Sequence, residues 1–312
     1  MIIKPSTNRN LFGMKTFFDQ FKKLYHEDKM PSKIILTGKK GAGKSTLAYH
    51  IINYILSINE EVKYDDKNFK INEKNKSFKL VQNNTHPNFY LIDLLNEKKN
   101  IDIDQIRKLI IYTNKSSFND LPRFILIDNI ENLNTSSTNA LLKLIEEPNK
   151  GIFFILIHNI EKNILPTLKS RCISFKINFN FTDNIRILNQ LLDENIFDII
   201  NFDLINYYNT PGEVIRLISF CKEKKINLKD MNLDALLNLL IEQSYYKKNE
   251  FVKNVIVNFI EHFFLKEFMF NNHRQKLLNF YYYFINKNYN SDKFNLDYES
   301  LFLEFKSKML NG

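Results

Sequence analysis

The chain has 312 residues, with 44 Lys or Arg against 35 Asp or Glu, a formal net charge of +9, and 44% hydrophobic residues. This length allows two or three domains with a substantial core, and the absence of a long uncharged apolar stretch argues against a membrane segment. The N-terminus lacks an apolar signal-peptide region, and the two cysteines, Cys172 and Cys221, are far apart. We therefore expect a cytoplasmic protein without a disulfide scaffold.

The spacing of the histidines and the distribution of charge indicate which ligands the chain can be expected to bind. No pair of histidines has metal-ligand spacing, so we expect no zinc site; the six are His26, His50, His86, His158, His262 and His273. A net positive charge suits a nucleic-acid partner. However, Lys, Asn and Ile are abundant along the whole chain, which equally indicates a compositional bias rather than a focused basic patch.

Short apolar runs alternate with helical stretches up to about residue 177. Such β-branched or aromatic runs are typical of strands buried on both faces of a parallel sheet, and the alternation predicts an α/β domain with right-handed crossovers. We predict N-caps at Asp104 and at Thr135 or Ser136. The predicted strands are 34–37, 89–93, 123–128, 152–157 and 173–177, and the predicted helices are 46–56, 104–114, 136–146 and 162–170.

Two further regions complete the chain. Residues 58–85 are polar with mixed charge and are predicted to be a long surface excursion. After about residue 178 the strand signal ends, and the pattern predicts a small helical domain over 178–226 and a larger all-helical domain over 227–312. The predicted helices there are 185–192, 196–200, 211–222, 233–244, 249–270, 273–286 and 298–309.

Residues 38–45 read GKKGAGKS and match G-x-x-x-x-G-K-[ST] at every fixed position. An apolar strand precedes the match and a helix follows it, which is the setting of a phosphate-binding loop. In that setting the lysine reaches phosphate oxygens and the following hydroxyl ligates Mg²⁺. The alternative is a glycine-rich turn with a solvated lysine, which the agreement of motif and flanks disfavours. The predicted nucleotide-binding residues here are Gly38, Gly41, Ala42, Gly43, Lys44, Ser45 and Thr46.

A second candidate site residue lies at the end of the predicted strand over 123–128. Asp128 ends an apolar strand, where a carboxylate in P-loop proteins orients Mg²⁺; the alternative is an ordinary capping residue. The next position holds Asn129, whose amide cannot accept a proton near pH 7. Glu131 lies two positions further, a shift that rarely preserves geometry. The sequence therefore predicts ATP and Mg²⁺ binding with slow hydrolysis or none.

Two further segments carry a resemblance to a known family. Residues 139–148 read NALLKLIEEP and residues 170–172 read SRC, and with the P-loop they resemble the bacterial clamp-loader AAA+ family of DNA polymerase III. The resemblance is dense over about residues 8–177 and weaker beyond. Other similar stretches are LFG at 11–13, HP at 86–87, IDIDQIRKL at 101–109, FILIHN at 154–159 and TPG at 210–212.

The resemblance implies roles for individual residues. Lys44, Ser45 and Asp128 would form the nucleotide–Mg²⁺ site, Asn159 or else His158 would be the sensor of the γ-phosphate, and Arg171 would be an arginine finger toward the ATP of a neighbouring subunit. The alternative for Arg171 is a structural salt bridge. The implied fold class is an α/β P-loop (AAA+) domain with a parallel five-stranded sheet over 1–177, a helical lid domain over 178–226 and an all-α oligomerisation collar over 227–312.

Departures from the pattern favour one branch of the family. No cysteine lies between Ser45 and Asp128, whereas gamma/tau motor subunits carry a four-cysteine zinc module there. Gly212 falls where motor subunits have a sensor arginine, and Arg216 comes one turn later. With Asn129, these losses resemble delta-prime subunits.

A delta-prime-like chain is expected to act in a complex. It would be a weakly hydrolysing or non-hydrolysing component of the polymerase holoenzyme, a nucleotidyltransferase complex active in DNA replication. Its partners would be the gamma/tau and delta subunits and, through the complex, the sliding clamp and primed DNA. The alternatives are a gamma/tau-like ATPase motor and a DNA-binding P-loop scaffold outside replication.

Overall fold

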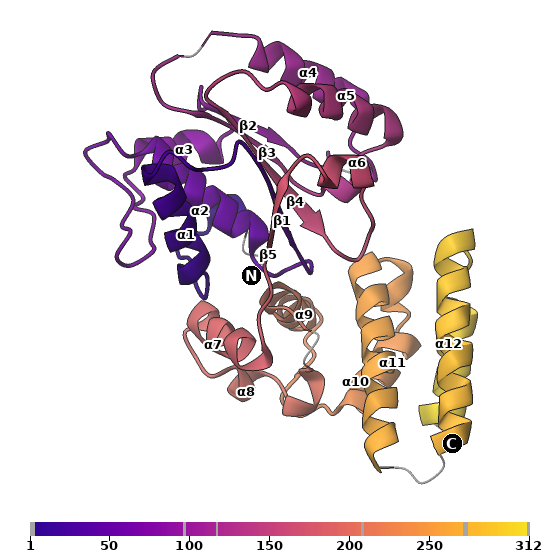
Figure 1. The fold of residues 1–312 in the computed structure, drawn as a ribbon. Helices are drawn as coiled ribbons and strands as arrows, with labels where there is room; N and C mark the ends of the chain where they lie inside the picture. The colour runs from indigo at the N-terminus through magenta and orange to yellow at the C-terminus, as the bar shows by residue number, and fades with distance from the viewer. Residues whose placement is uncertain (1–3, 96–97, 117, 207–208, 271–273, 311–312) are drawn as a thin grey trace. The chain divides into compact units, whose positions relative to one another are not determined.

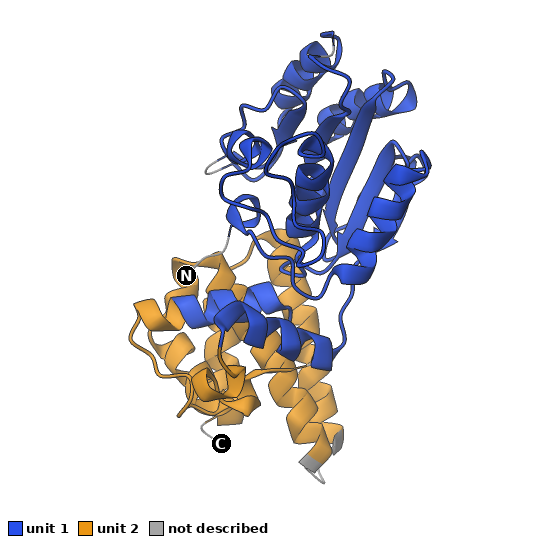
Figure 2. Ribbon diagram, turned by 90° about the vertical axis from the view of Figure 1, so that its left-hand side faces the viewer, with its two compact units in different colours: residues 1–193, 209–219 blue, residues 194–208, 220–312 orange. Residues whose placement is uncertain are grey.

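The computed structural model describes residues 4–95, 98–116, 118–206, 209–270 and 274–310. The chain divides into two compact units, which Figure 2 distinguishes by colour. The first comprises Met1–Asp193 with Asn209–Ser219, and the second Glu194–Tyr208 with Phe220–Gly312. The three-domain division expected from the sequence remains a prediction.

A five-stranded sheet organises the first unit, in the order β2-β3-β4-β1-β5 with every pair parallel. The parallel five-stranded α/β fold predicted from the sequence is confirmed. The strands are β1 (Lys33–Gly38), β2 (Phe89–Ile92), β3 (Arg123–Ile127), β4 (Ile152–Asn159) and β5 (Ile173–Lys176). The helices of this unit are α1 (Lys15–His26), α2 (Lys44–Leu56), α3 (Lys76–Gln82), α4 (Ile103–Thr113), α5 (Thr135–Glu146), α6 (Pro166–Lys169) and α7 (Phe181–Leu192).

Helices cover both faces of the sheet. α1, α2 and α3 lie on one face, and α4, α5 and α6 on the other (Figure 1). The inner strand β3 is buried at all five positions, as the unbroken apolar run predicts. The edge strand β5 departs from the expectation of burial on both faces: Ile173 is 54% exposed. β5 pairs on one side only, with β1, and among its residues Phe175 alone packs against the core.

Most of the segment over 58–85 lies on the surface, as expected from its polarity, but a few residues anchor it in the core. Its apolar residues Tyr64, Ile71 and Phe78 are buried in the core beneath α1 and α2. The Tyr64 hydroxyl lies 2.8 Å from Nδ1 of the buried His50. Burial lowers the pKa of His50 to about 4, so this histidine is neutral inside the core. A few apolar residues spaced through a charged segment therefore fix it to the domain.

Two helix N-caps differ from the sequence expectation. α4 begins with a capping box in which Asp102, not Asp104, is the N-cap and Gln105 reciprocates. α5 is capped by the Asn134 side chain, which accepts from the Ser137 N–H, and not by Thr135 or Ser136. Both corrections are shifts of one or two residues among neighbouring cap-forming side chains, for which local sequence gives nearly equal preference.

The second unit is helical, and aromatic side chains fill its interior. Phe259, Phe264, Phe284, Phe302 and Phe305 are at most 2% exposed. The sequence-predicted helix over 273–286 begins outside the described residues and continues to Phe294. Among the described residues, no helix is long and apolar enough to cross a membrane. The helices are α8 (Ile196–Ile199), α10 (Leu233–Glu242), α11 (Glu250–Phe270), α12 (Arg274–Phe294) and α13 (Glu299–Phe305), while α9 (Pro211–Glu223) crosses the unit boundary.

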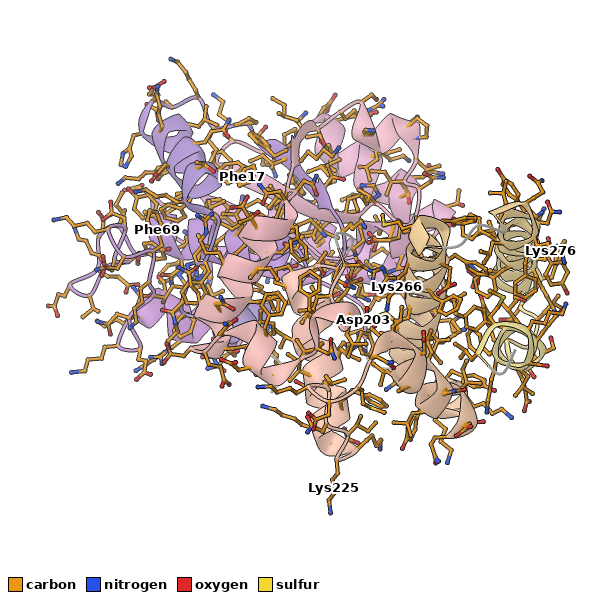
Figure 3. All side chains as sticks on the ribbon, turned by 90° about the horizontal axis from the view of Figure 1, so that it is seen from below. Phe17, Phe69, Asp203, Lys225, Lys266 and Lys276 are labelled. Carbon is orange, nitrogen blue, oxygen red and sulfur yellow. The ribbon has the colours of Figure 1, made fainter. Side chains whose placement is uncertain are left out.

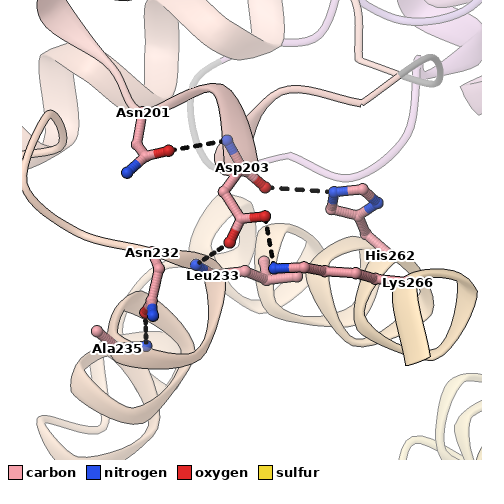
Figure 4. A network of polar contacts seen from close by, with 7 residues as sticks. All are labelled: Asn201, Asp203, Asn232, Leu233, Ala235, His262 and Lys266. Carbon is pink, nitrogen blue, oxygen red and sulfur yellow. Dashed lines mark hydrogen bonds and ion pairs between the residues drawn. The ribbon is translucent and has the colours of Figure 1, made fainter. Parts of the chain in front are cut away.

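One carboxylate joins three segments of this helical unit. Asp203 accepts hydrogen bonds from the Leu233 N–H at 2.9 Å and from the Lys266 ammonium at 2.6 Å (Figures 3 and 4). Its carbonyl oxygen lies 3.3 Å from Nε2 of His262. Partial burial raises the pKa of Asp203, but the hydrogen bonds from Lys266 and Leu233 outweigh it and lower the pKa overall. Asp203 therefore holds the start of α10 and the middle of α11 together.

We expect Asp203→Asn to lower the free energy of unfolding by about 1–2 kcal/mol, because a charge-assisted bond to the partly exposed Lys266 is lost. Asp198→Asn is the control, since Asp198 makes only a 3.9 Å exposed contact to Lys229. Because the folded-state pKa of Asp203 is lowered, its contribution is present above the ordinary carboxyl pKa and lost as pH falls through the lowered value. Urea unfolding at neutral and acidic pH checks both points. Equal effects of the two substitutions would contradict the assignment.

Candidate functional site

The glycine loop between β1 and α2 has the backbone that its sequence requires. Gly41 and Gly43 both have φ +81°, a left-handed conformation that favours glycine. α2 begins at Lys44, directly after this turn. The loop therefore places the N-terminus of a buried helix, with its partial positive charge, beside the carboxyl ends of β1, β3 and β4.

Lys44 is the most unusual side chain of the loop because it is a buried cation, only 3% exposed. Its ammonium donates to the carbonyl oxygens of Gly38 at 2.9 Å and Lys39 at 2.6 Å, and to Oδ1 of Asn159 at 2.9 Å. Burial lowers its pKa to about 8, while Glu161, Asp128 and Glu131 oppose that shift. All three ammonium protons therefore have acceptors, as a buried charge requires.

Ser45 and Asp128 face each other across the sheet edge. The Ser45 hydroxyl donates to Oδ2 of Asp128 at 2.6 Å. Burial raises the pKa of Asp128 to about 6, although the hydrogen bond from Ser45 lowers it. A hydroxyl and a carboxylate at this separation form the oxygen donor pair that a hard divalent cation such as Mg²⁺ prefers.

An amide network links the loop to two strand ends. Asn159 Nδ2 donates to Oδ1 of Asn129 at 3.1 Å and to Oε1 of Glu131 at 2.5 Å. Asn129 has φ +57° and donates from its own Nδ2 to Oδ1 of Asp93 at 2.7 Å. Of the two sensor candidates, Asn159 contacts Lys44, whereas His158 bonds instead to Thr37 and to the Lys162 carbonyl.

Sequence reasoning gave no role to Asp93 or Glu161. β2 and β3 pair with Ile92 opposite Ile127, so Asp93 and Asp128 both follow the paired strand ends. A polar residue directly after a buried strand next to the Asp128 strand is the signal that could have found Asp93. Glu161 accepts from the Lys40 N–H of the loop at 3.0 Å, and its position depends on a turn after β4 that has no sequence signature.

A cavity of about 330 Å³ opens beside the loop within the first unit. Its polar part includes Lys44, Ser45, Asp128 and Asn159, and Gly41, Ala42, Gly43 and Thr46 also line it. The apolar part is formed by Leu11, Phe12, Ile187, Leu191 and Ile215. A phosphate-type loop at one end and an apolar wall at the other give a shape and chemistry suited to a small ligand with an anionic tail and a flat apolar head.

The start of α9 packs directly on the glycine loop. The Gly212 N–H donates to the Gly41 carbonyl at 3.0 Å, and the Thr210 hydroxyl donates to the Lys40 carbonyl at 2.7 Å. A Cβ on Gly212 would lie 2.7 Å from the Cα of Gly41. Arg216, one turn later, lines the cavity. The TPG segment is therefore a backbone contact of the loop, which only glycine at position 212 permits.

Arg171 does not belong to this cavity. It follows α6 on the surface and forms an ion pair with Glu146, the last residue of α5, at 2.7 Å. Its side chain is 37% exposed. The structure therefore brings the loop residues, Asp128 and Asn159 together and places Arg171 elsewhere.

No metal centre is found in the described part of the chain: no three or more His, Cys, Asp or Glu side chains there could together hold an ion. His273 lies outside the described residues. Cys172 and Cys221 are free, and burial raises the pKa of both thiols, to about 11 and about 12.

The fold and this site define a class of protein. A parallel sheet, a glycine loop that opens a helix, and a lysine, serine and aspartate that meet at the strand ends are the parts of a P-loop α/β protein. The chain belongs to the family described as DNA polymerase III, delta subunit, whose model matches residues 13–180. The family resemblance drawn from the P-loop, EEP and SRC segments is thereby confirmed.

The chain is similar to several subunits of DNA polymerase III. A DNA polymerase III subunit delta' of Buchnera aphidicola subsp. Schizaphis graminum is 25% identical over 287 residues, 86% of this chain and 82% of that one. The delta' subunit of Pseudomonas aeruginosa is 32% identical over 98 residues, only 31% of this chain and 30% of its own length. A gamma subunit of the same Buchnera is 27% identical over 248 residues, covering 79% and 61%. The chain is thus similar to both delta' and gamma subunits.

The contact between Gly212 and the loop gives a stability prediction. Gly212→Ala should lower the free energy of unfolding by about 1–3 kcal/mol, because its Cβ meets the backbone of Gly41, which cannot move aside as a flexible side chain would. Lys222→Ala on the exposed face of the same helix serves as the control. Thermal unfolding of both variants measures the difference, and an unchanged melting temperature for Gly212→Ala would mean that the loop contact is not held in solution.

Proposed function

We propose that this protein is the delta-prime subunit of the DNA polymerase III clamp-loader complex, which binds ATP, hydrolyses it weakly or not at all, and supplies Arg171 to a neighbouring subunit. Family membership and the delta' relatives support the assignment. The observation that carries the finer claim is the location of Arg171: it is exposed and lies outside the cavity of its own chain.

The residues of the cavity suit ATP with Mg²⁺. Lys44 would hold the phosphates together with the loop backbone, Ser45 and Asp128 would hold the cation, and the apolar wall would receive the base. When bound, the cation would neutralise phosphate charge. Lys44 would have to release at least one of its present acceptors, and Asn159 is the only side chain among them.

We expect weak hydrolysis because the side chains that could activate a water molecule are already engaged in hydrogen bonds. Asn129 occupies the position after Asp128, and its amide both donates to Asp93 and accepts from Asn159. Glu131 accepts from the side chain and the backbone of Asn159. A carboxylate that already holds an amide is poorly placed to take a proton from water. The site therefore favours binding over turnover.

Arg171 is proposed to act in trans. A guanidinium on a transferring phosphoryl group stabilises the charge of the transition state. The proposed partners are the gamma/tau and delta subunits, with the sliding clamp and primed DNA reached through the complex. Residues 178–226 would form the lid and 227–312 the collar by which the ring assembles.

Nucleotide binding by the purified chain is the first test. We expect ATP to bind, and Lys44→Ala to weaken it by about 10- to 100-fold through the loss of a charge-assisted contact. Lys79→Ala, an exposed lysine of α3, is the control. Calorimetric titration with circular dichroism as a check of folding measures this. Equal affinity of the two variants would contradict the proposed site.

The trans role of Arg171 is the second test. In a complex reconstituted with gamma/tau and delta, Arg171→Ala should reduce turnover at the neighbouring nucleotide site by roughly 10³- to 10⁵-fold and abolish clamp loading. Arg186→Ala is the matched control because Arg186 is also an exposed arginine in an ion pair, with Asp183. DNA-stimulated phosphate release and clamp loading provide the two readouts. Normal activity with Arg171→Ala, or vigorous ATPase by the isolated chain, would instead favour a gamma-type motor.

A further inference from the structure

The Arg171 guanidinium makes two hydrogen bonds and one ion-pair contact. Nε donates to Oε1 of Glu146 at 2.8 Å, and Nη2 lies 2.7 Å from the same oxygen. On the opposite edge, Nη1 donates to the Thr167 carbonyl at 3.0 Å. The guanidinium plane is thus held from two sides, by α5 and by α6. Two of its five N–H groups donate these hydrogen bonds, which leaves N–H groups on both terminal nitrogens.

The position of Glu146 is unfavourable for its own helix. It is the last residue of α5, where the partial negative charge of the helix end repels a carboxylate. The compensating cation comes from Arg171, 25 residues later in the chain. A carboxylate placed against the local preference and paired with one distant arginine points to a role for the pair beyond helix stability.

Stability alone does not account for the pair. The side chains of Arg171 and Glu146 are 37% and 47% exposed, and ion pairs of such exposure add little to folding. A long arginine side chain that must meet an anion does benefit from being held in one conformation, because less freedom is lost when the anion arrives.

The surroundings of Arg171 suit contact with another surface. Leu165 before it and Ile173 after it are 41% and 54% exposed, and Ile173 belongs to the edge strand β5. Arg171 thus lies between two exposed apolar side chains, although Leu168 of the same stretch is buried in the core.

We propose that Glu146 is a positioning residue that fixes the Arg171 guanidinium so that the remaining N–H groups of its two terminal nitrogens meet an anionic phosphate of a neighbouring subunit. This inference rests on the proposed trans role of Arg171. Glu146 touches no substrate and acts through the orientation of Arg171. The matched control is Glu147, its exposed neighbour in the same EEP segment.

The test uses the reconstituted complex with Glu146→Ala, Glu146→Gln, Glu147→Ala and Arg171→Ala, each assembled complex isolated before assay. Glu146→Ala should lower kcat by about 5- to 50-fold with KM for ATP unchanged, because a misaligned guanidinium loses contacts made only in the transition state. Glu147→Ala should stay within about twofold of the unchanged complex. Glu146→Gln should recover most of the rate, because both contacts go to one oxygen, Oε1, and an amide oxygen can replace it.

The double variant Glu146→Ala with Arg171→Ala should be no slower than Arg171→Ala alone, since one residue acts through the other. Equal rates for Glu146→Ala and Glu147→Ala, with Arg171→Ala strongly impaired, would overturn the positioning role and leave the proposed function intact. A silent Arg171→Ala would overturn the proposed function itself. Failure of the Glu146→Ala complex to assemble would show a structural role and also overturn the inference.

Discussion

A buried ammonium group needs acceptors, and the arrangement of the site follows from how Lys44 obtains them. Two acceptors are carbonyl oxygens of its own loop, and the third is the side chain of Asn159 at the end of β4. That third contact ties the loop to the sheet. Through Asn159 it extends to Asn129 and Glu131, and through Asn129 to Asp93 at the end of β2. The parallel order of the strands makes this chain of contacts possible, because it places all these ends along one edge.

In the proposed function, two tasks that ATPases usually combine are separated: binding a nucleotide and hydrolysing it. In the proposed function Lys44, Ser45 and Asp128 would hold the phosphates and the cation, while Asp93 and Glu131 accept hydrogen bonds from amide groups. Arg171, the proposed arginine finger, lies outside the cavity. Its guanidinium is held by Glu146 and the Thr167 carbonyl. In the proposed function, the protein would therefore hold its own nucleotide and contribute to the chemistry of another subunit.

Much of this could be predicted from the sequence because the signals are local. The P-loop residues are contiguous, and the apolar runs of β1, β3 and β4 are largely buried as their composition implies. What failed depended on tertiary context. The polarity of residues 58–85 does not reveal that Tyr64, Ile71 and Phe78 are buried, and the composition of β5 does not reveal that it ends the sheet.

Several contacts of the site also depend on tertiary structure and could not be predicted from the local sequence. The proximity of Asp93 to Asp128 depends on the register in which β2 and β3 pair. The packing of Gly212 on Gly41 joins residues 171 positions apart. No local pattern encodes either contact. The Glu146–Arg171 pair likewise joins two motifs that the sequence could name separately but not connect.

The central claim, that this site keeps its nucleotide rather than consuming it, is tested most directly by acid quenching of the isolated protein mixed with a stoichiometric amount of radiolabelled ATP and Mg²⁺. The account predicts that the protein-bound nucleotide is recovered as intact ATP after prolonged incubation. Rapid conversion of the bound ATP to ADP, followed by further turnovers when ATP is added in excess, would contradict it.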